Sequence, residues 1–372
     1  MNIPLSSPDV SEAEINAVGA VLRTTRLSLG GKLEEFEQSL AAYAGTKHGV
    51  ALSSGTAALH LALLSAGISA GEEVIVPSFA FIAVANAVRY VGAIPVFVDI
   101  DPQTLNMAPA AVAAAVTPKS RAIIVVHTFG VPAAMEELLE IARRQHLAII
   151  EDACEALGGE YQGRKLGSFG KAGVFGFYPN KQITTGEGGA LVTSDAKVAA
   201  HARMLRNQGR DSSEEWFSHQ EIGYNYRISE INCALGIAQL ARIREILKAR
   251  ERVAEMYETR LRHHGHLILP PMESAQGKIS WFVYVVRLAE RFAGAGRDRI
   301  AAELTARGIG CGRYFAPIHQ QPAYRNVPHR CMDLEVTESI AQRTLALPFF
   351  NQLEETQVDE VCRVLREVMS RT

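Results

Sequence analysis

Residues 121–151 read RAIIVVHTFGVPAAMEELLEIARRQHLAIIE, in which two short apolar runs enclose a stretch of helical spacing. The runs at 121–126 and 147–151 predict β-strands, and residues 134–146 predict the helix that joins them. Apolar strands that alternate with helices are typical of a mostly parallel sheet with helices on both faces. This stretch therefore predicts an α/β fold.

The same alternation extends to both sides of this stretch. Further strands are predicted at 72–77, 95–100, 173–178 and 189–193, and further helices at 56–66, 79–91 and 109–116. In such sheets ligands bind beyond the carboxyl ends of the strands. Residues that directly follow a strand are therefore the first candidates for function.

The last third of the chain has a different pattern. From Ser229 to about Gly265 it predicts one continuous helix, in which the Arg/Glu-rich segment 242–262 favours a solvated face with charge pairs over a basic partner-binding surface. A smaller α+β domain is predicted from a strand at 281–288 and helices near 297–307, 335–345 and 354–370. We place the boundary near residue 245, which gives a large domain of residues 1–245 and a small domain of residues 246–372.

Composition excludes several classes of protein. The 372 residues carry 38 Lys and Arg against 40 Asp and Glu, a net charge of −2, so nothing indicates binding to nucleic acid or to an anionic membrane. The first residues form no secretory leader, and no apolar stretch approaches the ~18 residues of a membrane span. Five scattered cysteines without a CxxC pair are expected to be reduced thiols. We therefore expect a cytoplasmic globular protein.

Several well-known site motifs are missing from the sequence. It has no GxGxxG after a strand, no GxxxxGK[ST] and no HExxH, so dinucleotide, Walker and zincin sites lack their residues. His127 and His319 stand in separate segments without a metal-ligand partner at short spacing. Each is expected to be a hydrogen-bonded structural histidine, and no metal site is predicted.

Three other features point to a phosphate-bearing cofactor. Residues 53–56, Ser-Ser-Gly-Thr, open a predicted helix, where free backbone N–H groups can hold an anion, although this motif alone is explained more simply as an N-cap. Asp152 ends a strand and either faces a ligand or caps the next segment. Lys181 follows another strand in an apolar, Gly-rich passage, which is an unusual place for a surface lysine.

Taken together, the three features match the needs of pyridoxal phosphate. The helix start would hold the phosphate, the carboxylate would keep the ring nitrogen protonated, and the lysine, 29 residues after Asp152 (181 − 152), would form a Schiff base. An aromatic residue usually covers the ring. Phe81 follows a predicted strand and is either this stacking residue or part of the core.

Longer motifs make the sequence similar to the DegT/StrS-type family of sugar aminotransferases, which are pyridoxal-phosphate enzymes of fold type I. The matching segments are residues 54–60, 77–81, 95–101, 151–156, 177–181, 184–189, 206–209, 223–227, 313–319 and 344–348. They cover nearly the whole chain in the family's order. The resemblance implies an aspartate-aminotransferase-like large domain with a mostly parallel seven-stranded sheet, and a smaller C-terminal α+β domain.

The resemblance also implies roles for single residues near the cofactor. Lys181 would form the Schiff base and, once released, move a proton between the substrate carbon and the cofactor. Asp152 would pair with the pyridinium nitrogen and Phe81 would stack on the ring. Gly55 and Thr56 would bind the phosphate.

Further roles implied by the resemblance involve the substrate and a second subunit. Asn225 would reach the cofactor phosphate of the neighbouring subunit, so that a homodimer shares its sites across the interface. Arg227, Arg313 and His319 would lie towards a nucleotide diphosphate. The expected reaction takes an amino group from an amino acid, usually L-glutamate, to a keto group of a nucleotide-linked 6-deoxysugar, as in polysaccharide or glycan biosynthesis.

The chain departs from the family pattern at two positions. Gly176 replaces a serine whose hydroxyl would contact the phosphate, so only its backbone N–H remains. Glu155, at the contact to the cofactor hydroxyl, replaces a common glutamine and favours amination at carbon 4, as in perosamine synthases. Carbon 3, a sugar dehydratase and a non-catalytic regulatory protein are the alternatives, and the retained Lys181 argues against the dehydratase. Cys154 is expected only to pack near the cofactor.

Overall fold

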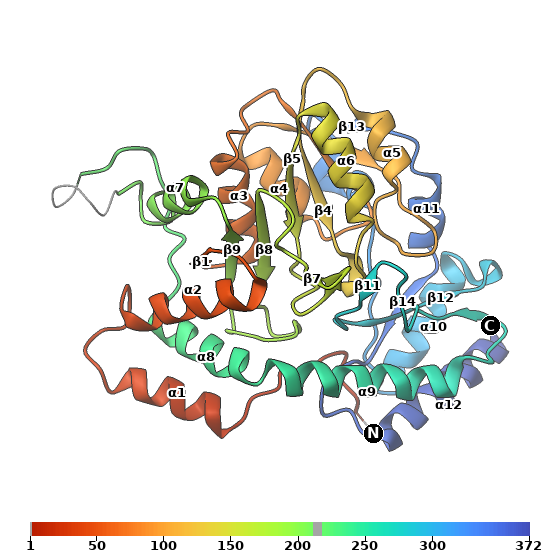
Figure 1. Ribbon diagram of the computed structural model, residues 1–372. Coiled ribbons are helices and arrows are strands. Elements are labelled where there is room, and N and C mark those ends of the chain that lie inside the picture. Colours follow the sequence, from red (N-terminus) through yellow and green to blue (C-terminus); the bar gives the residue numbers. More distant parts are fainter. Residues whose placement is uncertain (1, 211–217) are drawn as a thin grey trace.

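The computed structural model describes residues 2–210 and 218–372, and its main feature is a sheet of eight strands in the order β1-β9-β8-β5-β4-β2-β3-β13 (Figure 1). β9 runs antiparallel to its neighbours β1 and β8, and the remaining neighbours are parallel. The strands are β1 (His48–Leu52), β2 (Glu73–Pro77), β3 (Ile94–Val98), β4 (Ser120–Val126), β5 (Ala148–Asp152), β8 (Ala172–Gly176), β9 (Gly189–Thr193) and β13 (Arg330–Cys331). The mostly parallel sheet is confirmed.

Two strands of the large sheet, β1 and β13, lie outside the strand ranges predicted from the sequence. Beyond the expected seven, β13 adds an eighth strand, in which Arg330 and Cys331 pair with Val96 and Phe97 of β3. A strand of two residues is too short to produce a hydrophobic pattern. Because β13 comes from the last third of the chain, this part of the chain also contributes to the large sheet.

Helices cover both faces of the sheet, because successive strand residues point to opposite sides. Ala51 and Ile75 lie in one core cluster, while their neighbours Val50 and Val74 lie in the other. The first face carries α2 (Gly31–Ala44), α5 (Pro109–Ala115), α6 (Met135–Gln145) and α8 (Glu230–Ala241), and the second carries α3 (Gly55–Ser65), α4 (Ala83–Tyr90) and α7 (Ala196–Arg206). The helix expected at 79–91 begins only at Ala83.

The helix expected from Ser229 to Gly265 is in fact two helices. α8 ends at Ala241 and α9 (Ile243–Leu261) begins two residues later. Arg242 between them has a ψ of 7°, outside the helical range, and its guanidinium pairs with Asp9 and with Glu14 of α1 (Glu12–Leu22). The break therefore coincides with the attachment of the N-terminal segment.

The C-terminal part packs around its own core. It contains a sheet of β10 (Leu267–Ile268), β12 (Tyr284–Leu288) and β14 (Thr344–Leu347), with α10 (Ala295–Ala306), α11 (Glu335–Ala341) and α12 (Glu355–Arg371). The third sheet, which is also small, consists of β6 (Glu160–Tyr161), β7 (Arg164–Lys165) and β11 (Gly277–Lys278). The helix expected at 335–345 ends at Ala341, because Thr344 and Leu345 are needed for pairing between β14 and β12.

α9 connects the two parts of the molecule and runs along one side of it (Figure 1). Its first turns contribute Ile243 and Ile246 to the core of the large sheet, whereas Val253 and Tyr257 belong to the C-terminal core. Ile3, from the start of the chain, also packs in the C-terminal core. The boundary near residue 245 stays a prediction, and these contacts show which segments cross it.

Candidate functional site

Two adjacent carboxylates end β5 and have different surroundings. Glu151 is fully buried, accepts N–H groups from the 167–170 loop and lies 3.1 Å from Nε2 of His127. Asp152 shares the face of Ile150, which packs in the cluster under α3, and its Oδ1 accepts the N–H of Cys154 at 3.1 Å. Glu151 is therefore engaged in holding a loop, while Asp152 keeps acceptor capacity towards α3.

The N-terminus of α3 lies against the ends of β8 and β9. Ser54 caps the helix by accepting the N–H of Ala57 at 3.0 Å, and in the described part of the chain the N–H groups of Gly55 and Thr56 have no acceptor. A Cβ on Gly189 would come within 2.3 Å of the Gly55 nitrogen, so the helix start can approach the strand only because of this glycine. The motif is thus both an N-cap and a source of free donors.

The side chain of Lys181 lies between a carboxylate and a phenyl ring. Its Nζ is 3.6 Å from Oε1 of Glu155 and 3.9 Å from the ring centroid of Phe282, a residue from the C-terminal part. Oε2 of Glu155 accepts the N–H of Phe129 at 2.9 Å, and this residue has a φ of 55°, in the left-handed region. Burial raises the pKa of Glu155, while the Lys181 ammonium opposes that change.

Residues that the sequence did not single out complete the surroundings of Lys181. Nε2 of Gln182 donates to the carbonyl of Glu155 at 2.6 Å and to the carbonyl of Ser280 at 3.2 Å. The ring of Tyr314 stacks at 6.4 Å on that of Phe282, and burial raises its pKa, so the phenol stays neutral. Tyr314 lies in a motif that was recognised, but no local pattern indicated that it would stack on Phe282.

Arg250 is a second residue that sequence reasoning missed. It belongs to the segment expected to be a solvated face, yet only 3% of its surface is exposed. Its guanidinium binds the backbone of the Lys181 loop. The signal was available, because Arg250 lies four residues after Ile246 and three before Val253, in phase with the buried side of α9.

The model of the DegT/DnrJ/EryC1/StrS aminotransferase family matches residues 8–366. The chain belongs to this family. It is 42% identical over 369 residues to a protein named GDP-perosamine synthase from Caulobacter vibrioides, a match that covers 99% of this chain and 98% of the relative. Membership in the family makes the protein a sugar aminotransferase, and the alternative of a non-catalytic regulatory protein is set aside.

Solved structures of sugar aminotransferases have the same fold. PseC from Helicobacter pylori, an aminotransferase involved in the biosynthesis of pseudoaminic acid, superposes with a TM-score of 0.94 at 28% identity, and each chain is covered completely. The pyridoxal-phosphate form of the putative sugar aminotransferase Spr1654 from Streptococcus pneumoniae gives 0.94 at 27% identity, covering 100% of this chain and 99% of that one. Fold type I and the dependence on pyridoxal phosphate are thus confirmed.

The residues present fit this cofactor. The start of α3 offers free N–H donors for a phosphate, the Asp152 carboxylate ends the neighbouring strand, and Lys181 supplies a primary amine in the same region. Burial and the charge of Asp152 raise the pKa of the Cys154 thiol well above its usual value, so this thiol stays neutral. It packs near Asp152 and Lys181, whose charges both act on it. A Cβ at Gly176 would lie 3.3 Å from its sulfur, which leaves little room for the family's serine.

Phe81 and Asn225 both lie on the surface of the single chain. Phe81 is 61% exposed, so the alternative that it is a core aromatic is wrong. Asn225 is exposed, and its neighbours Tyr224 and Tyr226 line a pocket of about 470 Å³ that also contains Thr56. Stacking of Phe81 on the cofactor and the contact of Asn225 with a second subunit stay predictions.

The three residues expected near the nucleotide have partners within the chain. Arg227 donates to Oδ1 of Asn207 at 3.1 Å, and Arg313 pairs with Oδ1 of Asp298 at 3.2 Å. The Nδ1 of His319 lies 2.7 Å from Oγ of Ser78, and its Nε2 lies 2.9 Å from Oε1 of Glu338. His319 and His127 are therefore both hydrogen-bonded, as expected of structural histidines. The substrate contacts of the three residues stay predictions.

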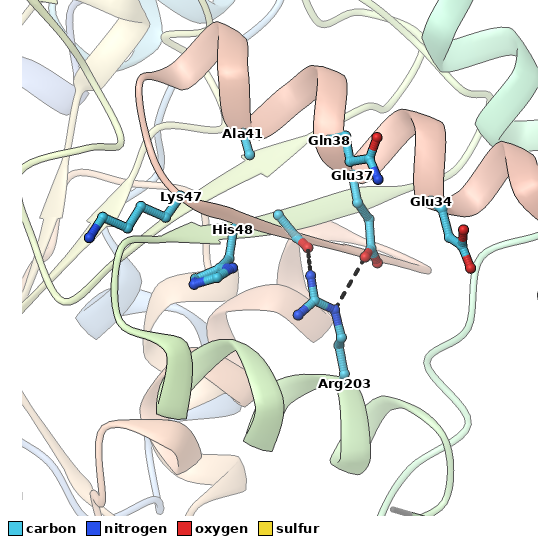
Figure 2. Close-up of a pocket in the computed structure, with 8 residues that line it drawn as sticks. Glu34, Glu37, Gln38, Ala41, Lys47, His48 and Arg203 are labelled. Carbon is cyan, nitrogen blue, oxygen red and sulfur yellow. Dashed lines mark hydrogen bonds and ion pairs between the residues drawn. The ribbon is translucent and has the colours of Figure 1, made fainter. Parts of the chain in front are cut away.

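A second pocket, of about 340 Å³, lies between α2, the start of β1 and α7. Figure 2 shows Arg203 pointing towards Glu37, with Lys47 and His48 beside it. Nε of Arg203 is 3.3 Å from Oε2 of Glu37, and its Nη2 donates to the carbonyl of Gly49 at 2.7 Å. The central charges of this pocket are thus already paired with each other.

Across residues 2–210 and 218–372, no group of His, Cys, Asp and Glu is arranged to hold a metal ion. In the same residues, no helix has both the length and the apolar character required to cross a membrane.

Proposed function

We propose that this sugar aminotransferase transfers an amino group from L-glutamate to the keto group at carbon 4 of a nucleotide-linked 6-deoxysugar. The observation that carries the proposal is Glu155, a carboxylate 3.6 Å from Nζ of Lys181, at a position where carbon-3 enzymes of the family commonly have glutamine. The 42% identity to a GDP-perosamine synthase supports it and makes guanosine diphosphate the first nucleotide to test.

Each residue has a part in this reaction. Pyridoxal phosphate supplies a ring that accepts the charge left when the substrate carbon loses its proton. The N–H groups of Gly55 and Thr56 would bind the phosphate, and the Asp152 carboxylate would hold the proton of the ring nitrogen. Nζ of Lys181 would hold the cofactor and, when free, would move a proton at that atom.

Two groups control the immediate surroundings of this amine. Oε1 of Glu155 orients Nζ from one side, and the Phe282 ring excludes water from another. Tyr314, stacked on Phe282 and neutral, extends this covered wall. The amine is thus held between a polar and an apolar contact.

The carbon position and the nucleotide can be tested by product analysis. The protein would be supplied with glutamate and with GDP-, UDP- or dTDP-linked 4-keto and 3-keto sugars, and the aminated carbon would be assigned by NMR. We expect amination of the 4-keto substrates and the fastest turnover with the GDP sugar. Turnover of 3-keto sugars alone would replace the proposal by the carbon-3 alternative.

We further propose a homodimer in which Asn225 completes the site of the partner subunit, supported by its exposure and by the position of Thr56 in the same pocket. Mixing Lys181→Ala with Asn225→Ala tests this. In a shared arrangement, one of the two sites of each mixed dimer has both native residues. Each mixed dimer should therefore have up to half of the activity of the wild-type dimer. No restoration in dimers shown to have exchanged subunits would contradict a shared site.

The cytoplasmic location also stays a prediction.

A further inference from the structure

Arg250 is a buried cation that makes no salt bridge with any described residue, and the charge of Asp9 acts on it only from a longer distance. Within the residues that the structure describes, no carboxylate lies within 4.0 Å of its guanidinium, although Arg242 and Arg260, near the two ends of the same helix, each pair with acidic residues. Burial lowers the pKa of Arg250 to about 10, which still leaves it charged at neutral pH. Burying an ion in this way is costly, so its position calls for an explanation.

The polar contacts of Arg250 are backbone carbonyls from two segments. Nη2 donates to the carbonyl of Lys181 at 2.8 Å and to that of Asn180 at 3.4 Å, while Nη1 donates to the carbonyl of Phe282 at 3.1 Å. A guanidinium presents several donors in one rigid plane, whereas a lysine ammonium is a single point on a flexible stem. Only the former is suited to holding both segments at once.

These two segments are the ones that meet at the lysine amine. Lys181 and Phe282 lie about a hundred residues apart in the chain, and the Phe282 ring centroid is 3.9 Å from Nζ of Lys181. We propose that Arg250 is a positioning residue of the amino-transfer site, which ties the backbone of Lys181 to that of Phe282 and so keeps the ring over the amine. The inference rests on the role of Lys181 in the proposed function.

The arrangement has a clear mechanical consequence. Arg250 belongs to α9, whose two ends pack in the two different cores of the molecule. Its guanidinium therefore lies where the C-terminal part meets the loop that carries the lysine. Without it, the Lys181 loop and Phe282 can separate, which uncovers Nζ and misplaces it for proton transfer.

Chemical labelling of the full-length, cofactor-free protein measures the cover of the amine directly. Lysines would be acetylated briefly at one fixed pH, and Lys181 would be quantified by peptide mass spectrometry against the surface residue Lys171. We expect Arg250→Met to raise this ratio several-fold and Arg250→Lys to raise it less. The control is Arg252→Met on the same helix, since exposed Arg252 also binds two carbonyls, those of Asn351 and Leu353, and should leave the ratio unchanged.

A purely structural arginine would lower the thermal midpoint of unfolding without a selective change at Lys181, and that result would overturn the proposal. If Arg250→Met does not fold, Arg250→Lys decides. Its labelling ratio at Lys181 should rise. With cofactor bound, its kcat for the glutamate half-reaction should fall at little-changed KM. An unchanged labelling ratio together with an unchanged kcat would refute the proposal. Since labelling needs no cofactor, a failure of wild-type protein to bind pyridoxal phosphate would count against the proposed function alone.

Discussion

The α2–β1–α7 pocket and the surroundings of Lys181 differ in how completely their charges are paired. In the α2–β1–α7 pocket, Glu37 accepts the N–H of Ala51 at 3.0 Å and pairs with both Arg203 and Arg206 (Figure 2). At the amino-transfer site, Glu155 accepts one N–H group and shares a longer contact with Lys181. Both carboxylates are buried, but Glu37 pairs with two arginines, whereas Glu155 has one cationic neighbour at a longer distance.

This difference distinguishes a structural cluster of charges from the proposed catalytic one. Charges that are fully paired by the protein stabilise the fold and have no capacity left for a ligand. The unused acceptor capacity of Asp152 and the free N–H groups of α3 indicate that something else must satisfy them. A pocket of charged residues is therefore not by itself evidence for binding. The following four experiments test the contrast.

Replacing the lysine should have the largest effect. Lys181→Ala removes the amine that attaches the cofactor and moves the proton, so we expect the glutamate half-reaction to slow by more than about 10³-fold. The absorbance band of covalently held pyridoxal phosphate should also disappear. A variant that keeps this band would break the assignment of Lys181.

Asp152→Asn comes next. The amide has nearly the same shape but cannot hold the ring nitrogen's proton as a carboxylate does, so the half-reaction rate should fall by about 10²- to 10³-fold while the cofactor remains bound. Stopped-flow absorbance with glutamate measures this rate. An unchanged rate would show that the free acceptor capacity of Asp152 serves no chemical purpose.

Glu37→Gln should affect stability instead of chemistry. It leaves Arg206, which is buried, with a neutral partner, and breaking a buried ion pair costs about 3 kcal/mol of the free energy of unfolding. Urea denaturation measures the loss, and the half-reaction rate of the folded variant should be unchanged. A selective loss of activity at full stability would show that Glu37 acts in the chemistry, and the distinction between the α2–β1–α7 pocket and the surroundings of Lys181 would then be wrong.

Glu155→Gln should have the smallest effect, which is a pH-dependent change in the free energy of unfolding. Because the pKa of Glu155 is raised in the folded protein, its proton is held more tightly there than in the unfolded chain. Its contribution to stability is therefore present at low pH and is lost as the pH rises through the raised pKa. Between pH 4 and pH 8 the variant should therefore gain stability relative to the native protein.

Urea denaturation at several pH values would follow this difference, with Glu37→Gln treated in parallel as the matched control. The glutamine variant should gain steadily over the native protein on going to higher pH. A difference that does not change with pH, or that changes in the opposite direction, would mean that the contact with Lys181 outweighs burial at Glu155.

Much of the fold was readable from local patterns. The strand and helix positions around 121–151 agree with β4, α6 and β5 to within one residue. The errors arose where tertiary contacts override local spacing. Thr344 was predicted to be helical but pairs in β14, and the helix predicted through Arg242 is interrupted where this side chain binds the N-terminal segment. β13 exists only because β3 offers it an edge.

Local sequence patterns predicted the α/β fold and singled out the start of α3, Asp152 and Lys181, because each depends on residues adjacent in the chain. The surroundings of the lysine follow only from the tertiary fold. Glu155, Phe282 and Arg250 come from three distant segments, and no spacing rule connects them. Their meeting depends on how α9 packs in two cores at once, which is a property of the folded chain and not of any stretch of it.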